Sequence, residues 1–290
     1  DMLLPPDADR EDIENYSRAL GLNEPLWKQY FIFVQNILQG DLGYSFYHEV
    51  PALGLVLERM PATLELAATA LILAILMGVP LGIYAGLHPN SRFSKVIMGL
   101  SIFGVSIPNF WQGVMLILIF SVSLHWLPST GRGEVGVFLG IHSSIFTLDG
   151  ISHLILPSLN LSIFYAALLL RLTRANVMEV ALLDYIKFAH AKGLSRSRVI
   201  FIHILKNVGI PLITVIGLEF GSLIAFSVIT ETIFSWPGMG KLIIDSIFLL
   251  DRPVIVSYLI IVAVLFSLIN LVVDLLYSVL DPRISVGTAE

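Results

Sequence analysis

The residues whose position most suggests chemistry are carboxylates inside or beside long apolar stretches: Glu65, Glu219, Glu231 and Asp274. An ionisable side chain is expensive inside a membrane, and it usually faces a cavity, a neighbouring helix or a partner. Around one of these carboxylates, spacings of three and four residues predict one helical face that carries Glu219, Ser222, Phe226 and Thr230. Two interpretations follow. This face lines a translocation pathway, or each carboxylate only caps a helix end or bonds to a neighbouring helix.

Motifs of catalysis are missing from the sequence. It contains no HExxH, no GxSxG and no cysteine. The segment GMGKL at 238–242 lacks the first glycine of a phosphate-binding loop and the Ser or Thr that follows its lysine. The seven histidines do not pair at helical spacing within an apolar run, and a net charge of -5 is not typical of a nucleic-acid-binding protein. We expect a non-catalytic chain with no metal or cofactor of its own and no nucleic acid partner.

The composition indicates an all-α integral membrane protein. The chain is 56% hydrophobic and 13% charged, whereas soluble domains carry about 25% charged residues. Five apolar runs approach the roughly 20 residues that cross a bilayer, and they cover 62–87, 96–127, 154–172, 199–230 and 254–280. Pro108 lies inside the second run, where its missing N–H and its ring are expected to kink or break the helix.

The orientation follows from the distribution of Lys and Arg, which favour the cytoplasmic side. The most basic connection is 184–211, so it is predicted to be cytoplasmic. The acidic residues 1–60 then form a periplasmic cap with short helices over 8–22 and 26–40. Residues 61–283 form the membrane domain, and 284–290 form a cytoplasmic tail. Trp126 and Trp236 would lie at the outer interface.

Small residues recur at every fourth position of the first apolar run: Ala74, Gly78, Gly82 and Gly86. This spacing gives one helix face on which another helix can approach closely. The partner is either a helix of the same chain or, in a dimer, a second copy.

The basic segment 184–211 is expected to contain a short surface helix over about 184–196. Asp184 can cap its start and Gly193 can end it. Such a helix either docks another protein or binds lipid headgroups through its basic residues. The residues predicted to carry docking are Asp184, Lys187, Ala189, Lys192, Gly193, Leu194 and Arg196.

A family resemblance decides between these alternatives. The patterns AxAKGL at 189–194 and HxLKN at 203–207, followed by Pro211, resemble the coupling-helix loop of ABC-importer permeases. The resemblance is strongest to the peptide and nickel importers, and in particular to the first of their two permease subunits. Further matching segments are PATLELA at 61–67, GVSIPNF at 104–110, ETIFSWPGMGKLIIDSI at 231–247 and NLVVDLLYSVLDPR at 270–283.

The resemblance implies a type I ABC-importer permease fold in the bacterial inner membrane, crossed several times. It also implies four partners besides membrane lipid: a homologous second permease, two cytoplasmic ATPase subunits that bind the ATP, and a periplasmic or lipid-anchored solute-binding protein. The sequence departs from the general importer motif at Lys187-Phe188-Ala189, where Glu-Ala-Ala is usual. A preceding membrane helix of the family is expected to be missing.

The expected function is to form half of a pathway for short peptides. Import of a nickel chelate or another small solute by the same machinery is the first alternative. A secondary carrier, an exporter or a membrane-embedded enzyme would be the others. The loop 131–152 is longer than the resemblance predicts, and its apolar segment VFLGIHSSIF argues against disorder. It either packs over the chain's own outer face or also contacts the solute-binding protein or closes the outer mouth.

Overall fold

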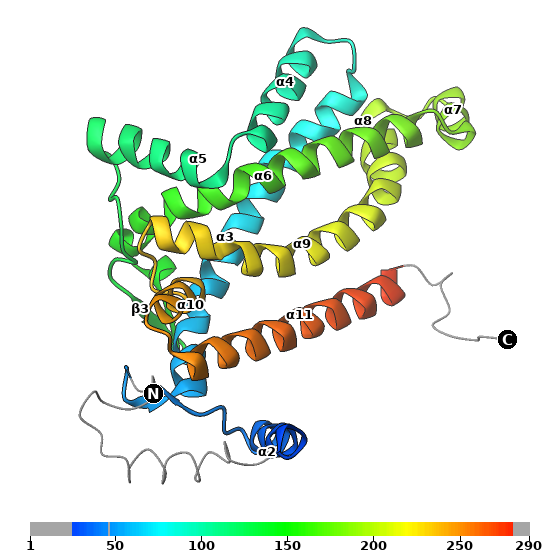
Figure 1. The fold of residues 1–290 in the computed structure, drawn as a ribbon. Coiled ribbons are helices and arrows are strands. Elements are labelled where there is room, and N and C mark those ends of the chain that lie inside the picture. The colour runs from blue at the N-terminus through cyan, green and yellow to red at the C-terminus, as the bar shows by residue number, and fades with distance from the viewer. Residues whose placement is uncertain (1–24, 46, 281–290) are drawn as a thin grey trace, which may run out of the picture. The chain divides into compact units, whose positions relative to one another are not determined.

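The computed structural model describes residues 25–45 and 47–280 (Figure 1). The predicted cap helix over 8–22 and the tail 284–290 lie outside these residues. In the described part, the long helices are α3 (Ala52–Leu87), α4 (Arg92–Ser106), α6 (Leu148–Ala181), α9 (Leu205–Ile233) and α11 (Arg252–Leu280). The shorter helical elements are α2 (Leu26–Leu38), α5 (Asn109–Leu116), η1 (Ile117–Ser123), η2 (Ser144–Phe146), α7 (Asp184–Ala191), α8 (Arg196–Arg198), η3 (Val199–Ile204) and α10 (Met239–Phe248).

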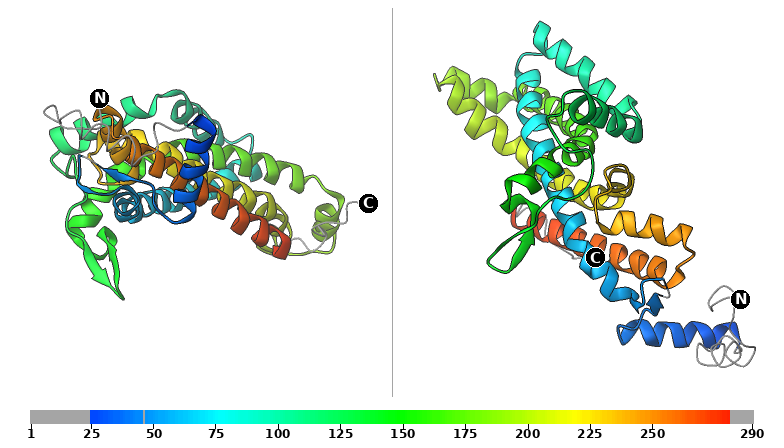
Figure 2. Two further views of the ribbon diagram at one scale, coloured as in Figure 1. Left: turned by 60° about the horizontal axis from the view of Figure 1, so that its bottom comes forward. Right: turned by 90° about the vertical axis from the view of Figure 1, so that its left-hand side faces the viewer.

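Two short antiparallel hairpins interrupt the helices, and the all-helical prediction did not include them. In the first, β1 (Tyr44–Ser45) pairs with β2 (Val50–Pro51); in the second, β3 (Gly136–Phe138) pairs with β4 (Ile141–Ser143). The second hairpin lies within the long loop and projects from the helices beside it (Figure 2). The loop is therefore folded, as its apolar composition predicts.

The chain divides into two compact units. In the described residues, the smaller unit combines residues 25–45 and 47–58 with Leu242–Ile261, and the larger contains Arg59–Lys241 and residues 262–280. In the smaller unit, the hydroxyl of Ser45 donates a 2.5 Å hydrogen bond to the carboxylate of Asp251, and both residues are buried. The predicted helix over 26–40 is present as α2, and the chain turns after it at Gly40, which has a φ of +79°.

The membrane-spanning pattern agrees with the predicted runs. In the described residues, four helices are long and apolar enough to cross a membrane, and α4 with the following α5–η1 segment forms a fifth candidate that is bent by 106°. The bend falls at Ile107 and Pro108, which confirms the predicted break. The third span is longer than predicted, because α6 continues in polar residues at both ends.

Helix α6 forms the centre of the larger unit, where it packs against α4, α5 and α9 (Figure 1). The small-residue face of α3 also lies on α6. A Cβ atom added at Gly78 would lie 2.6 Å from the carbonyl oxygen of Ala166, and one at Gly86 would lie 2.7 Å from the Cβ of Val177. The small residues therefore serve a close helix contact within the chain, which is the first of the two alternatives and not the dimer seam.

The two tryptophans predicted at the outer interface have different environments. Trp126 is 69% exposed, as an interfacial residue should be, whereas Trp236 is fully buried. The indole N–H of Trp236 donates a 2.9 Å hydrogen bond to the carbonyl oxygen of Ala62. The interfacial prediction for Trp236 was therefore wrong, because the turn after α9 folds its indole into the unit's core.

Candidate functional site

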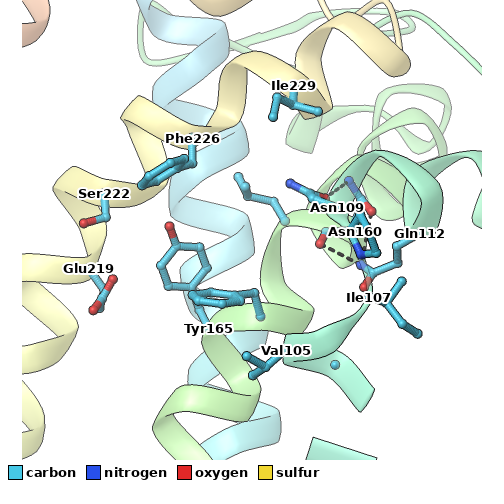
Figure 3. A pocket seen from close by; sticks show the side chains of 14 residues that line it. Val105, Ile107, Asn109, Gln112, Asn160, Tyr165, Glu219, Ser222, Phe226 and Ile229 are labelled. Atoms are coloured by element: carbon cyan, nitrogen blue, oxygen red, sulfur yellow. Dashed lines mark hydrogen bonds between the residues drawn. The ribbon is translucent and has the colours of Figure 1, made fainter. Parts of the chain in front are cut away.

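A cavity of about 370 Å³ lies in the larger unit, where the break between α4 and α5 faces α6 and α9 (Figure 3). Three of the four predicted pathway residues line it: Glu219, Ser222 and Phe226. The fourth, Thr230, is fully buried beside the cavity and takes part in a hydrogen-bond network. The structure therefore brings the predicted helical face together, with Thr230 turned inward.

The two ends of the cavity differ in chemistry. Glu219 and Ser222 project from α9 at one end, and the amide side chains of Asn109, Gln112 and Asn160 lie at the other (Figure 3). The ring of Tyr165, from α6, lies between them. Phe226 is 63% exposed in the isolated chain, so its ring is free to contact a ligand or a partner.

The amide end is a closed hydrogen-bond network that joins α5, α6 and α9. The amide nitrogen of Asn160 donates to the side-chain oxygen of Asn109 at 2.6 Å and to the hydroxyl of Thr230 at 3.0 Å. Gln112 donates to the backbone carbonyl of Asn160 at 2.9 Å and to its side-chain oxygen at 3.1 Å. The network fixes the start of α5 just after Pro108. Sequence reasoning missed it, although three amides within apolar segments were a usable signal.

The carboxylate of Glu231 is buried and hydrogen-bonded within the chain, so its role is structural. Its side chain is fully buried and accepts hydrogen bonds from the hydroxyls of Thr63 at 2.7 Å and Ser227 at 2.9 Å and from the backbone N–H of Lys241 at 3.0 Å. Thr63 in turn accepts the N–H of Met239 at 2.8 Å. A buried carboxylate with this many donors holds the turn after α9 against α3.

Glu65 anchors the long loop. Its carboxylate forms an ion pair with Arg132 and accepts hydrogen bonds from the hydroxyl of Ser144 and, at 2.9 Å, from the N–H of Ser144. The loop thus packs on the chain through its base, while the hairpin tip stays exposed: Leu139 is 86% and Ile141 is 62% exposed. The fourth carboxylate, Asp274, is exposed on α11 and does not line the cavity.

The predicted surface helix is α7, and its two faces have separate roles. Ile186 and Ala189 are buried in a cluster with Val177 of α6 and residues of η3 and α9, and Leu194 packs against this cluster. The opposite face exposes Tyr185 and Phe188. Of the predicted docking residues, the exposed ones are Asp184, Lys187, Lys192, Gly193 and Arg196.

The ends of α7 differ in part from the prediction. Leu183 occupies the N-cap position without a side-chain hydrogen bond, and Asp184 is the first helical residue. The capping role predicted for Asp184 was wrong, because its carboxylate instead bonds to the ammonium of Lys187 at 2.8 Å. At the other end, Gly193 has a φ of +76°, the left-handed conformation that ends a helix without strain at glycine.

A second contact ties the segment after α7 to the α3–α4 connection. The guanidinium of Arg196 donates to the Nε2 atom of His88 at 2.9 Å.

The exposed face of α7 combines an aromatic ring with positive charge, because the ammonium of Lys192 lies 4.6 Å from the ring centroid of Phe188.

The apolar helices, which are long enough to cross a membrane several times, define a multi-pass membrane protein with a polar-ended cavity and an anchored surface helix between two spans. Residues 78–286 match the family described as binding-protein-dependent transport system inner membrane component. The chain belongs to this family and is a permease of the bacterial inner membrane.

The relatives and solved structures agree with this assignment. The chain is 41% identical to the dipeptide transport system permease protein DppB of Escherichia coli (strain K12), over 91% of this chain and 83% of that protein. It is 41% identical to the oligopeptide transport system permease protein AppB of Bacillus subtilis (strain 168), over 98% and 88%. A solved structure of the MetNI methionine ABC transporter matches with a TM-score of 0.64 and 14% identity, over 78% of this chain and 96% of that one, which shows the shared type I permease fold.

Proposed function

We propose that this chain forms half of the translocation pathway of an ATP-driven importer of short peptides, and that a homologous second permease forms the other half. The similarity to dipeptide and oligopeptide permeases over more than nine-tenths of the chain carries the choice of peptides. It favours peptides over a nickel chelate. The known fold supports transport and offers no support for a secondary carrier or a membrane-embedded enzyme.

The cavity beside Glu219 is the proposed pathway wall of this subunit. Its volume of about 370 Å³ falls in the range of about 300–1,000 Å³ that small-molecule sites occupy. Phe226 projects from α9 toward it, and we propose that this ring acts as a gate. The closed network of Asn160 and Thr230 keeps the wall in place while a solute passes.

Energy is proposed to enter through α7. The chain carries no phosphate-binding loop, so ATP would be bound and hydrolysed by two cytoplasmic partner subunits. Phe188 and Lys192 present the outer face of α7 to such a partner. Ile186 and Ala189 pack α7 against α6, η3 and α9. A displacement of α7 would therefore move helices that form the cavity. If the basic residues only bound lipid headgroups, α7 would not need to be packed against these helices.

The outer side is proposed to receive a solute-binding protein. Residues 1–60, which precede the membrane domain 61–283, and the loop 131–152 within that domain would both lie there. The hairpin tip of the loop is apolar and exposed, while the Glu65 anchor keeps the base in place. An exposed apolar tip on a fixed base suits a contact with another protein more than a cover for the chain's own surface.

Reconstitution tests the whole proposal. The chain would be co-expressed with a candidate second permease, two ATPase subunits and a solute-binding protein from the same genome, and the complex would be placed in liposomes. Uptake of radiolabelled dipeptides and tripeptides that depends on ATP and on the binding protein is the expected result. Uptake of a nickel chelate without uptake of any peptide would overturn the choice of substrate. If the two ATPase subunits did not co-purify with the chain, the proposed function as an ATP-driven importer would be wrong.

A further inference from the structure

Among the described residues that line the cavity, a single one carries a charged side chain. Glu219 is the one acidic residue that lines it in the described part of the chain, and none of the described lining residues is Lys, Arg or His. The carboxylate of Glu219 makes no hydrogen bond or ion pair with the described residues. A carboxylate within a membrane span needs a favourable partner, because its ionised form is otherwise costly there.

Of the other three carboxylates in or beside the apolar runs, Glu65 and Glu231 already have such partners, and Asp274 is exposed on α11 and does not line the cavity. Glu65 is paired with Arg132 and Ser144, and Glu231 accepts three hydrogen bonds from Thr63, Ser227 and Lys241. The chain thus satisfies its structural carboxylates internally. Glu219 differs from them because its carboxylate faces a cavity and has no partner among the described residues.

The hydrogen-bond donors at the amide end of the cavity are used within the chain. Both hydrogens of the Asn160 amide are used, by Asn109 and Thr230, and the Gln112 amide donates to two oxygens of Asn160. These groups hold the cavity wall. The polar groups left beside the carboxylate are the hydroxyls of Ser222 and Tyr165.

We propose that Glu219 binds the free ammonium group at the amino terminus of a peptide while the peptide crosses the membrane. This inference rests on the proposed function of peptide import. An ammonium supplies three donors and a positive charge, and charge-assisted hydrogen bonds to a carboxylate are about twice as strong as neutral ones. Ser222 and Tyr165 can accept or donate beside it.

The same geometry selects against the other end of a peptide. A carboxylate would meet the like charge of Glu219 and, among the described lining residues, no cation. The apolar side chains of Ile107, Phe226 and Ile229 also line the cavity and suit an apolar side chain of the peptide. The peptide is therefore oriented, with its amino end at α9.

Binding to the assembled permease pair with its ATPases, held in lipid nanodiscs without the solute-binding protein, tests this directly. The probes are alanyl-leucine and its N-acetylated form, measured by equilibrium dialysis of the radiolabelled peptides. The wild type is expected to bind the free-amine peptide about tenfold or more tightly than the acetylated one, which corresponds to about 1.4 kcal/mol. Glu219→Gln is expected to remove this preference, and Glu219→Asp, which keeps the charge, to retain part of it.

Asp274→Asn is the matched control, since it removes a carboxylate from a span without touching the cavity. It should keep the wild-type preference. A wild type without preference, or a Glu219→Gln variant that keeps it, overturns the inference. An equal loss of affinity for both peptides also leaves the preference unchanged and overturns the inference, because the carboxylate then contributes to binding without contacting the ammonium group. Peptide uptake by the complete complex is measured in parallel, so normal uptake without the preference rejects this inference alone and leaves peptide import standing.

Discussion

The contact between α3 and α6 allows one substitution to be worked out from the structure. Gly82 lies on the small-residue face of α3, and a Cβ added there would lie 2.6 Å from the Cβ of Thr173 and 2.7 Å from the carbonyl oxygen of Leu170. Ordinary van der Waals contact starts at 3.4 Å. In Gly82→Ala, the two helices must therefore separate locally by a good part of an ångström, or Thr173 must leave its position.

The expected cost is that of overpacking, about 1–3 kcal/mol. For chains of this size, each kcal/mol shifts the unfolding midpoint by about 2–4 °C. Gly82→Ala should therefore lower the apparent midpoint by several degrees, measured by heating the purified complex and quantifying the remaining assembled fraction by size-exclusion chromatography.

Gly99→Ala is the matched control, because Gly99 is also a helical glycine and a Cβ added there meets nothing within 4 Å. Its midpoint should stay at the wild-type value or rise slightly, since alanine favours a helix by up to about 1 kcal/mol. Equal midpoints for the two variants would refute the close packing of α3 on α6. A larger drop for Gly99→Ala would show that α4 is covered by a surface that the isolated chain leaves open.

Three further predictions concern coupling and the outer surface. Phe188→Ala should lower peptide-stimulated ATP hydrolysis by about tenfold or more, as loss of an aromatic contact residue does. Ile186→Ala should mainly lower the thermal midpoint, because truncation of a buried side chain lowers the free energy of unfolding by about 2–5 kcal/mol. If both variants changed both readouts equally, the two faces of α7 would not have separate roles. Gly193→Asn should transport better than Gly193→Val, because asparagine tolerates a positive φ; equal rates would argue against a role for this turn. Leu139→Ser should reduce binding-protein-stimulated ATP hydrolysis without changing the midpoint, and an unchanged stimulation would remove the hairpin tip from the docking surface.

Much of the fold could be predicted from the sequence, because its determinants are local. The apolar runs report the membrane spans, since each span needs about 20 consecutive apolar residues. Pro108 breaks the second run and Gly193 ends the surface helix, because both effects come from backbone chemistry at one position. The position of the helical face with Glu219, Ser222 and Phe226 likewise follows from helical spacing.

The sequence alone could not distinguish the carboxylates from one another. Glu65, Glu219 and Glu231 all stand in or beside apolar runs, and their roles depend on residues far away in the chain. Arg132 pairs with Glu65, and Thr63 donates to Glu231, whereas Glu219 meets only a cavity. The burial of Trp236 and Ala189 has the same origin.

By itself, the sequence determined that this is an all-α membrane protein, how many apolar runs it has and where its helices break. These features depend on length, hydropathy and local backbone preference. Which polar group is satisfied within the chain and which is left for a ligand was decided only by tertiary packing. Hydrogen bonds and ion pairs form wherever the fold brings donors and acceptors together, and in this chain their partners are often more than 60 residues apart, as Arg132 and Glu65 are.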